Sequence, residues 1–449
     1  MSQPPLGPAD PTPGLPAPPG PSPAGATPPG RWSRMLPPTP LARRLSAQSV
    51  LFATGEGVFL TGSAVFFTQV VGLSATQVGL GLTIAGVVAF VLAVPLGRAA
   101  DRVGPRRTWA VTAFAGAGLY ALWPLISGFG GFVAMVVALE IVQTAGSAGR
   151  GAYTLDALPR GERVRSLAFM RAALNIGFTV GAGLGGLALA FESEAVIRAV
   201  PWVTAAVLLV NAVFIARLPD AAHDRAPVAA GSQVGPGALR NRGFLALTTC
   251  DGVLGTNQVL LNIVIPLWLV QETDAPPVLL AWLFGTNTVM AVLLQVAAAR
   301  GVDSVASSLR AARISAGFFV LSCLVVLVTH DTVGWVTIAL VWLGHVTVTG
   351  AELYQSAASW GFMSELSDPE RRGEYQGAAQ LGRTGGSVWA PALYTFLAVD
   401  GGTGGWLLIA AIVVVATLAM PAAARAAERH LAEHGSSGSG AAGSTTTSP

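Results

Sequence analysis

Acidic side chains inside long apolar segments are the residues of this sequence with the most evident chemical potential. Glu56, Glu140, Asp251 and Glu352 each lie within a different apolar run. A charged group in hydrocarbon costs at least about 2.5 kcal/mol at mid-depth, so each carboxylate must face a cavity, find a partner or hold a proton. Because burial favours the neutral acid, these residues are candidates for proton coupling or cation contact. The alternative for each is a structural hydrogen bond to a neighbouring helix.

Other polar residues in the apolar runs extend this set of candidates. Histidine ordinarily titrates near neutral pH, so His345 would suit proton coupling, although a lone histidine among apolar residues is more often simply hydrogen-bonded. Asn257, Gln258 and Asn262 cluster in one run, where amides can bind a substrate or link helices to one another. We treat all four residues as coupling or substrate candidates.

The composition places these residues in an integral membrane protein. Of 449 residues, 52% are hydrophobic and 11% are charged, whereas a soluble domain carries about 25% charged residues. The basic residues flank apolar runs and form no continuous basic face, which argues against nucleic-acid binding. Cys250 and Cys323 lie in apolar runs and are expected to be packing residues. No catalytic, metal-binding or nucleotide-binding motif is present, so we predict neither an enzyme nor a cofactor or metal.

Apolar runs long enough to cross a bilayer, at about 20 residues per crossing, divide the chain into six spans plus six. The twelve runs lie near residues 46–71, 75–98, 107–127, 131–155, 165–190, 199–217, 243–270, 277–299, 309–329, 333–359, 373–398 and 404–424. We predict helical bundles over 46–217 and 243–424, joined by a linker over 218–242. The remaining stretches, 1–45 and 425–449, are predicted to be disordered cytoplasmic tails because of their Pro, Gly and Ser content.

The arginines indicate how the spans are oriented. If both termini are cytoplasmic, every arginine except Arg198 falls on the cytoplasmic side, and the outside loops carry acidic residues, which are Glu192, Glu194, Glu272, Asp274, Asp331 and Asp400. This asymmetry is typical of the positive-inside rule. We therefore expect a multi-pass protein of the cytoplasmic membrane.

A charged motif separates the second and third spans. Residues 97–107 follow the pattern G-x-x-x-D-R-x-G-x-R-R, and we predict a tight cytoplasmic loop over 98–107. An ordinary basic loop that obeys the orientation rule is the alternative. The residues that make up the pattern are Gly97, Asp101, Arg102, Gly104, Arg106 and Arg107.

Short repeats relate the two halves of the chain. Residues 56–58 (Glu-Gly-Val) and 251–253 (Asp-Gly-Val) are 195 positions apart, and the Glu-Arg pairs at 162 and 370 are 208 apart. A Gly-rich segment follows each Glu-Arg pair, and Gly177 and Gly185 correspond in this comparison to Gly385 and Pro391. Two bundles derived from one unit would produce such a pattern.

Twelve spans, a central linker, two similar halves and the motif at 97–107 together resemble the major facilitator superfamily over about residues 46–424. The resemblance implies an all-α membrane fold of twelve transmembrane helices in two pseudo-symmetric six-helix bundles. It also implies that the motif residues form a gate at the cytoplasmic face, with Asp101 at a helix end of the other half. Arg150 resembles a family arginine that joins this network by pairing with Asp101 or Asp156, although it could equally be a positive-inside anchor.

The fifth span is similar to the antiporter signature of the same family, G-x-x-x-G-P-x-x-G-G. Ala182 replaces the proline of that signature, and the glycines are also consistent with close helix packing. The glycines concerned are Gly177, Gly181, Gly185 and Gly186.

The functional expectation is secondary active transport by alternating access. We expect proton-coupled export of a small amphipathic or drug-like compound, with a proton symporter that imports a small metabolite as the first alternative. A non-transporting membrane receptor on the same fold is a second alternative. The expected partners are a small-molecule substrate, protons and the lipid bilayer, with no nucleic acid, and the expected state is a monomer.

Overall fold

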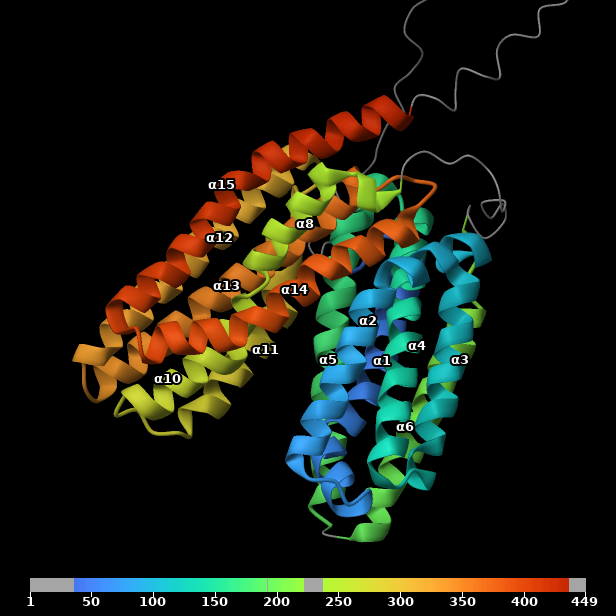
Figure 1. The fold of residues 1–449 in the computed structure, drawn as a ribbon, viewed down its shortest axis with the longest axis horizontal. Coiled ribbons are helices and arrows are strands. Elements are labelled where there is room, and N and C mark those ends of the chain that lie inside the picture. Colours follow the sequence, from blue (N-terminus) through green and yellow to red (C-terminus); the bar gives the residue numbers. More distant parts are fainter. Residues whose placement is uncertain (1–35, 192, 222–236, 436–449) are drawn as a thin grey trace, which may run out of the picture. The chain divides into compact units, whose positions relative to one another are not determined.

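The computed structural model describes residues 36–191, 193–221 and 237–435. The chain divides into two units, residues 1–36 and 37–449. The main helices of the second unit, labelled in Figure 1, are α1 (Pro40–Val65), α2 (Ala75–Val103), α3 (Pro105–Leu122), α4 (Gly128–Ala157), α5 (Arg163–Leu189), α6 (Glu194–Ala216), α8 (Arg242–Leu254), α9 (Asn257–Val259), α10 (Ile265–Glu272), α11 (Leu279–Ala298), α12 (Val305–Val328), α13 (Trp335–Leu366), α14 (Arg372–Val399) and α15 (Gly402–Gly435).

The helices of the two halves pack in corresponding pairs. In the first half α1 packs on α5, α2 on α4 and α3 on α6; in the second half α8 packs on α14, α11 on α13 and α12 on α15. One hydrophobic cluster, with Trp123 and Phe132, lies within the first half. A larger cluster, with Trp268 and Trp406, lies mainly in the second half and extends to Val94 of the first. The halves meet where α2 and α4 contact α14 and where α5 contacts α11 and α13. The prediction of two pseudo-symmetric six-helix bundles is therefore confirmed.

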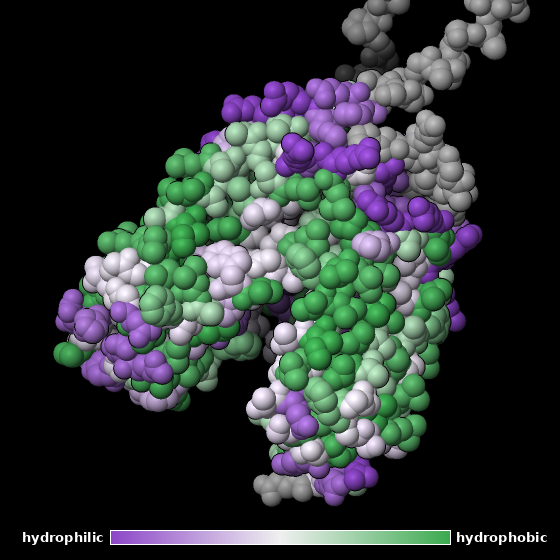
Figure 2. All heavy atoms as spheres, in the orientation of Figure 1, coloured by the Kyte–Doolittle hydropathy of each residue, from purple (hydrophilic) through white to green (hydrophobic). Residues whose placement is uncertain are grey.

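Ten helices are long and apolar enough to cross a membrane among the residues described. The helices that coincide with the predicted spans 107–127 and 373–398, α3 and α14, are not in that group. Arg106 and Arg107 lower the hydropathy of α3, and Arg372, Glu374 and Arg383 do the same for α14. Figure 2 shows the apolar residues spread over the outer faces of the helices, as expected for contact with lipid.

The outer helix boundaries differ from the predicted tails. Helix α1 begins at Pro40, inside the predicted tail, because the Thr39 hydroxyl accepts a hydrogen bond from the Ala42 N–H and proline suits the first helical position. Helix α15 continues to Gly435 through an alanine-rich stretch with high helix propensity. The rest of both predicted tails, residues 1–35 and 436–449, lies outside the described residues, as do residues 222–236 of the predicted linker.

The predicted loop over 98–107 is wrong in its local structure. Helix α2 continues to Val103 and α3 begins at Pro105, so Gly104 alone makes the turn. Its φ of 105° lies in a region that residues with a side chain rarely adopt. The φ of the proline that follows is fixed at a value that suits the first position of a helix. The charged motif is therefore held on a rigid helix end.

The seventh predicted span, 243–270, is interrupted rather than continuous. Helix α8 ends at Leu254, and a π-helical turn over Leu260–Val264 precedes α10. Pro266 lacks the N–H that would bond to the carbonyl of Asn262, which accounts for the irregular hydrogen bonding before it. Polar residues therefore lie in the middle of this predicted span, at the interruption between α8 and α10.

Candidate functional site

The carboxylate of Asp101 completes the N-terminus of a helix in the other half. Helix α14 has no capping side chain of its own, and its first free N–H groups are those at Gly373 and Glu374. Asp101 at the end of α2 accepts hydrogen bonds from these two groups at 2.7 and 2.9 Å. The carboxylate also lies at the positive end of the α14 dipole. The position that the sequence suggested for Asp101 is the one observed.

Ion pairs surround this contact between α2 and α14. Glu374, buried in the first turn of α14, accepts from Arg98 of α2 at 2.9 Å and from the backbone N–H of Ala238 at 3.0 Å. Arg372 of α14 pairs with Asp156 of α4 at 2.7 Å. We call the contacts made by these residues and Asp101 the α2–α14 latch.

Glycines allow the two helices of the latch to touch backbone to backbone. A Cβ at Gly97 would collide with the carbonyl oxygen of Gly373, and one at Gly377 would collide with that of Ala93. Such close approach of backbones is typical of small residues between membrane helices. Gly97 thus leaves room for α2 and α14 to touch at the latch.

The other motif residues do not cross between the halves. The Arg106 guanidinium donates to the carbonyls of Ala216 and Leu218 at 2.9 Å and pairs with Asp220, which satisfies the C-terminal end of α6. Arg102 and Arg107 are exposed and form no hydrogen bond or ion pair with the described part of the chain. Arg106 holds the first bundle together, whereas Asp101 joins the two bundles.

The expected pairing of Arg150 is wrong. Its guanidinium donates to the Ser49 hydroxyl at 3.0 Å and reaches neither Asp101 nor Asp156. Asp156 is instead engaged by Arg372 at the end of α4, about two helical turns beyond Arg150. The side chain of Arg150 points to a different place, a cavity between the two halves.

This central cavity has a volume of about 570 Å³ and is lined from both halves. Helices α4 and α5 contribute one wall, and α13, α14 and the α8–α9 segment contribute the other. Its charged lining residues are Arg150, Arg171 and Arg383, and its lining includes no Asp or Glu among the described residues. Glutamine, serine and threonine side chains supply most of the remaining polar surface. A volume of this size fits a small organic molecule.

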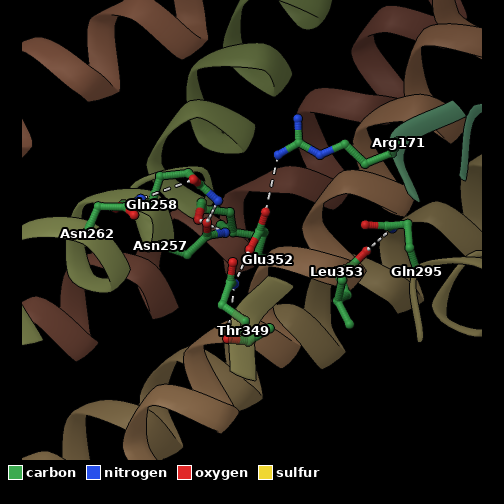
Figure 3. Close-up of polar contacts among 10 residues, drawn as sticks. Arg171, Asn257, Gln258, Asn262, Gln295, Thr349, Glu352 and Leu353 are labelled. Carbon is green, nitrogen blue, oxygen red and sulfur yellow. Dashed lines mark hydrogen bonds and ion pairs between the residues drawn. The ribbon is translucent and has the colours of Figure 1, made fainter. Parts of the chain in front are cut away.

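An ion pair next to the central cavity joins α5 to α13. Arg171 Nη2 lies 3.2 Å from the buried Glu352 Oε1, and the amide of Asn287 donates to Glu352 Oε2 at 3.0 Å. Figure 3 shows the guanidinium of Arg171 extending towards Glu352 across the space between their helices. Glu352 therefore has partners in the first half and in the second.

Only one of the three amide candidates lines the central cavity. Gln258 does so, while Asn257 is fully buried and donates to the Leu254 carbonyl at 2.9 Å within its own segment. Asn262 donates to the Gln258 carbonyl at 2.9 Å, as seen in Figure 3. Asn257 and Asn262 are thus satisfied locally, at the interruption between α8 and α10.

Glu56 lies against a second, smaller cavity inside the first bundle. This side cavity has a volume of about 120 Å³ and is lined by α1, α3, α4 and α6. Glu56 accepts hydrogen bonds from the Tyr120 hydroxyl at 3.2 Å and the Gln143 amide at 3.4 Å. Arg150 and Ser147 of α4 line both cavities.

The remaining ionisable candidates lie away from the cavity surfaces. Asp251 is buried behind the central cavity, where Gln355 donates to it at 3.1 Å. His345 is buried beside the backbone of Leu283, and Glu140 is half-buried on α4. Neither His345 nor Glu140 is among the lining residues of the two cavities. Among the described residues no group of three or more His, Cys, Asp or Glu side chains is placed to hold a metal.

The sequence of residues 45–391 matches the model of a family described as the Major Facilitator Superfamily. The chain belongs to the major facilitator superfamily. It is accordingly a multi-pass membrane protein and a transporter of small molecules rather than an enzyme. No curated protein sequence matches the chain.

Solved structures of major facilitator transporters share the fold at low sequence identity. The human organic anion transporter MFSD10 (TETRAN) is 14% identical, with 85% of this chain and 98% of that chain covered at a TM-score of 0.60. A bacterial homologue of the iron transporter ferroportin in the outward-facing state is 13% identical, with 87% and 100% covered and a TM-score of 0.64. The transporter FucP in the outward conformation is 14% identical, with 88% and 99% covered and a TM-score of 0.65.

In this member of the superfamily, the glycines of the fifth span pack against α1. A Cβ at Gly177 or Gly181 would collide with the carbonyl oxygen of Val50 or Thr54, and one at Gly185 would lie 2.7 Å from that of Val58. Gly186 faces open space. Close packing of α1 on α5 therefore accounts for three of the four glycines.

The second half of this superfamily member repeats the arrangement with different glycines from those matched in the sequence. Cβ atoms at Gly382 and Gly252 would collide with the carbonyls of Thr248 and Gly382, whereas Gly385 has open space around it. Gly382 and Gly386 thus make the close contacts of α14 with α8, and the match of Gly177 to Gly385 is wrong. Helix contacts, rather than the count of small residues, define the correspondence.

Several residues of the site were not found from the sequence. The sequence assigned no role to Arg98, Glu374, Arg171 and Arg383, although a charged cluster around Glu374 marks the start of the eleventh predicted span. For Arg171 and Arg383 the positive-inside rule indicates only the cytoplasmic side. Nothing in the local pattern indicates that they face a common cavity.

Proposed function

We propose that this superfamily member is a secondary transporter that works by alternating access, with the central cavity as its substrate site. The α2–α14 latch would be the gate on one side of that cavity. The observation that carries the proposal is the capping of α14 by Asp101 of the other half. When the halves separate at this end, two N–H groups and a carboxylate lose their partners, which gives closed and open states distinct energies.

We further propose that the latch lies at the cytoplasmic end and that both termini are cytoplasmic. The arginines near the latch and near the termini support this orientation under the positive-inside rule. Bundles over 46–217 and 243–424 would rock against each other as units, since the helices of each bundle pack on one another in pairs. The cavity is lined by a single chain, so a monomer would suffice.

The proposed energy source is the proton gradient, and the proposed direction is export of a small amphipathic compound. Buried carboxylates at Glu56, Asp251 and Glu352 support proton coupling. Apolar residues such as Leu174 and Trp360 beside polar ones in the cavity support an amphipathic substrate. The glycine pattern of α5 lends export less support than expected, because packing against α1 accounts for it.

Import by proton symport is the second candidate, and the ion pair between Arg171 and Glu352 favours it. A proton on Glu352 would weaken the pair and free the guanidinium at the cavity for a substrate. The groups that face this carboxylate are Arg171 from α5 and Asn287 from α11. Proton and substrate would then load together rather than compete.

The test is accumulation of fluorescent amphipathic compounds in an efflux-deficient bacterial host that produces the wild type or Asp101→Asn. The panel would contain anionic, neutral and cationic dyes, each measured with and without a protonophore. Export predicts lower accumulation in the wild type alone, and import predicts higher accumulation, in both cases abolished by the protonophore. We expect Asp101→Asn to reduce transport by about tenfold or more, since a charge-assisted contact contributes about 1.5–3 kcal/mol.

The matched control is Asp220→Asn, which changes an acid on the same face but within the first half. Normal transport by Asp101→Asn, at equal expression, would remove the gate assignment. Equal accumulation in all strains across the whole panel would favour the receptor alternative.

A further inference from the structure

We propose that the substrate of this transporter is an organic anion whose charged group binds among Arg150, Arg171 and Arg383. This inference rests on the proposed function, in which the central cavity is the substrate site. It adds the chemical class of the substrate, which neither the fold nor the alternating-access proposal supplies.

The charged side chains that line the cavity are all positive among the described residues. Three guanidinium groups line it, from α4, α5 and α14, and no carboxylate lines it among the described residues. Arg150 and Arg171 are close enough for their charges to repel each other. Cations gathered in one cavity of a membrane protein are costly unless an anion balances them. The field inside this cavity therefore favours an anion and opposes a cation.

The three guanidinium groups differ in their partners. Arg171 has Glu352, and Arg383 lies near the buried Asp251 while donating to the Gln380 side chain at 2.9 and 3.1 Å. Arg150 has only a neutral partner in the described structure, the hydroxyl of Ser49. A guanidinium presents five N–H donors in a planar fork, so Arg150 retains donors for a carboxylate, sulfonate or phosphate group.

Arg171 also has donor capacity that its ion pair does not use. Its Nε is buried and has no hydrogen-bond partner in the part of the chain described. Only one of its terminal nitrogens, Nη2, contacts Glu352, so the planar fork is not engaged in a bidentate pair. Arg171 can therefore bind a ligand oxygen without first losing Glu352.

The remaining lining defines the rest of the ligand. Leu167, Met170 and Leu174 of α5 and Trp360 and Met363 of α13 provide apolar surface in the same cavity. An anionic group bound by the arginines would leave an apolar or aromatic body against these side chains. The predicted ligand is an amphipathic organic anion, and a lipophilic cation is excluded by the charge of the wall.

Thermal unfolding of the full-length protein in lipid nanodiscs would test this inference without requiring transport. The probes are naphthoate and naphthalenesulfonate, with naphthamide and naphthylmethylammonium as neutral and cationic probes of similar shape. We expect the anions alone to raise the melting temperature, because a ligand that binds only the folded state stabilises it. Stabilisation equal to or greater than that of the anions by the neutral or cationic probe, or no stabilisation by either anion, would overturn the proposal.

Variants would locate the binding site. We expect Arg150→Gln and Arg383→Gln each to weaken anion binding about tenfold to a hundredfold. Arg198→Gln is the matched control, because Arg198 is an exposed arginine paired with Glu194 on α6 and does not line the cavity. Unchanged anion affinity in both cavity variants would overturn the assignment of the site.

The anion site and the transport cycle can fail separately. Asp101→Asn lies outside the cavity, so it should bind the anions normally even though its transport is impaired. Transport of neutral compounds with no anion binding would contradict the substrate class and leave the transporter proposal intact. Arginine-dependent anion binding together with equal accumulation in all strains would contradict transport and retain the anion site.

Discussion

The turn between α2 and α3 and the corresponding turn between α11 and α12 have related sequences but different contacts. Asp101 of the first turn caps α14 in the other half. Asp303 of the second is exposed, and within the described residues its carboxylate accepts only a 3.4 Å bond from Ser307 at the start of α12. Ala299 stands four residues before Asp303, where the first copy has Gly97. A backbone-to-backbone contact thus accompanies the acid in only one of the two copies.

This difference teaches that the pseudo-symmetry of the fold does not extend to its latch. Both turns contain a glycine of positive φ, Gly104 and Gly301, but Gly104 alone separates α2 from α3, whereas residues 299–304 separate α11 from α12. The cross-bundle contact instead depends on the small residue one helical turn before the acid and on an uncapped helix facing it. Substitutions in and around the two turns should therefore differ in their effects, and the largest effect is expected at Gly97.

Gly97→Val should prevent closure of the α2–α14 latch. The added side chain would collide with the Gly373 carbonyl, and overpacking of this kind costs about 1–3 kcal/mol. Spin labels would be attached at the exposed positions Arg107 and Arg310 after replacement of the two native cysteines. Electron paramagnetic resonance should then show a longer distance between the labels in Gly97→Val than in the protein without this substitution. Gly86→Val is the control, because Gly86 faces open space on the same helix. An unchanged distance distribution in Gly97→Val would contradict the role of Gly97 in the α2–α14 latch.

Glu352→Gln should separate substrate exchange from the proton gradient. Glutamine cannot titrate, and it resembles the protonated carboxylate that would release Arg171. We expect exchange of substrate across the membrane to persist when the pH is equal on both sides. Accumulation driven by a pH difference should be lost. Proteoliposomes loaded at two pH values would measure both activities. Retained pH-driven accumulation would show that the proton is carried elsewhere.

Glu56→Gln and Asp251→Asn should have smaller effects on coupling than Glu352→Gln. Neither carboxylate lines the central cavity, although the two occupy corresponding places in the repeats. Asp251→Asn should also lower stability by about 1 kcal/mol, through its bond with Gln355. The same proteoliposome assay and thermal unfolding would measure these effects. Complete loss of pH-driven accumulation in Glu56→Gln would move the proton site to the side cavity.

Asp303→Asn should be the mildest change, although it alters the same residue type in the corresponding turn. Asp303 is a surface residue with a single long hydrogen bond. Surface substitutions of this kind change the free energy of unfolding by no more than about 0.5 kcal/mol. Transport by Asp303→Asn should match the wild type in cells where Asp101→Asn is impaired. A loss equal to that of Asp101→Asn would show that both turns act as gates.

Sequence alone indicated the membrane class, the twelve helices and the division into two halves, and the family resemblance implied that Asp101 lies at a helix end of the other half. These features depend on local properties, which are the length of apolar runs, the placement of arginines and a compact motif. The match of residues 45–391 to the superfamily confirms the fold they predicted. The helical structure of residues 98–103 was missed because charged residues near a membrane surface are compatible with either a loop or a helix end.

Only the tertiary structure decided which polar groups meet. Arg150, Arg171 and Arg383 come from three helices and line one cavity, and Glu352 pairs with Arg171 across the two halves. Helices in a bilayer are apolar on the lipid side as well as in the core, so their periodicity does not mark the inner face. These contacts depend on the rotation of each helix about its axis and on the angles at which helices far apart in the chain cross. The local sequence pattern does not specify these angles.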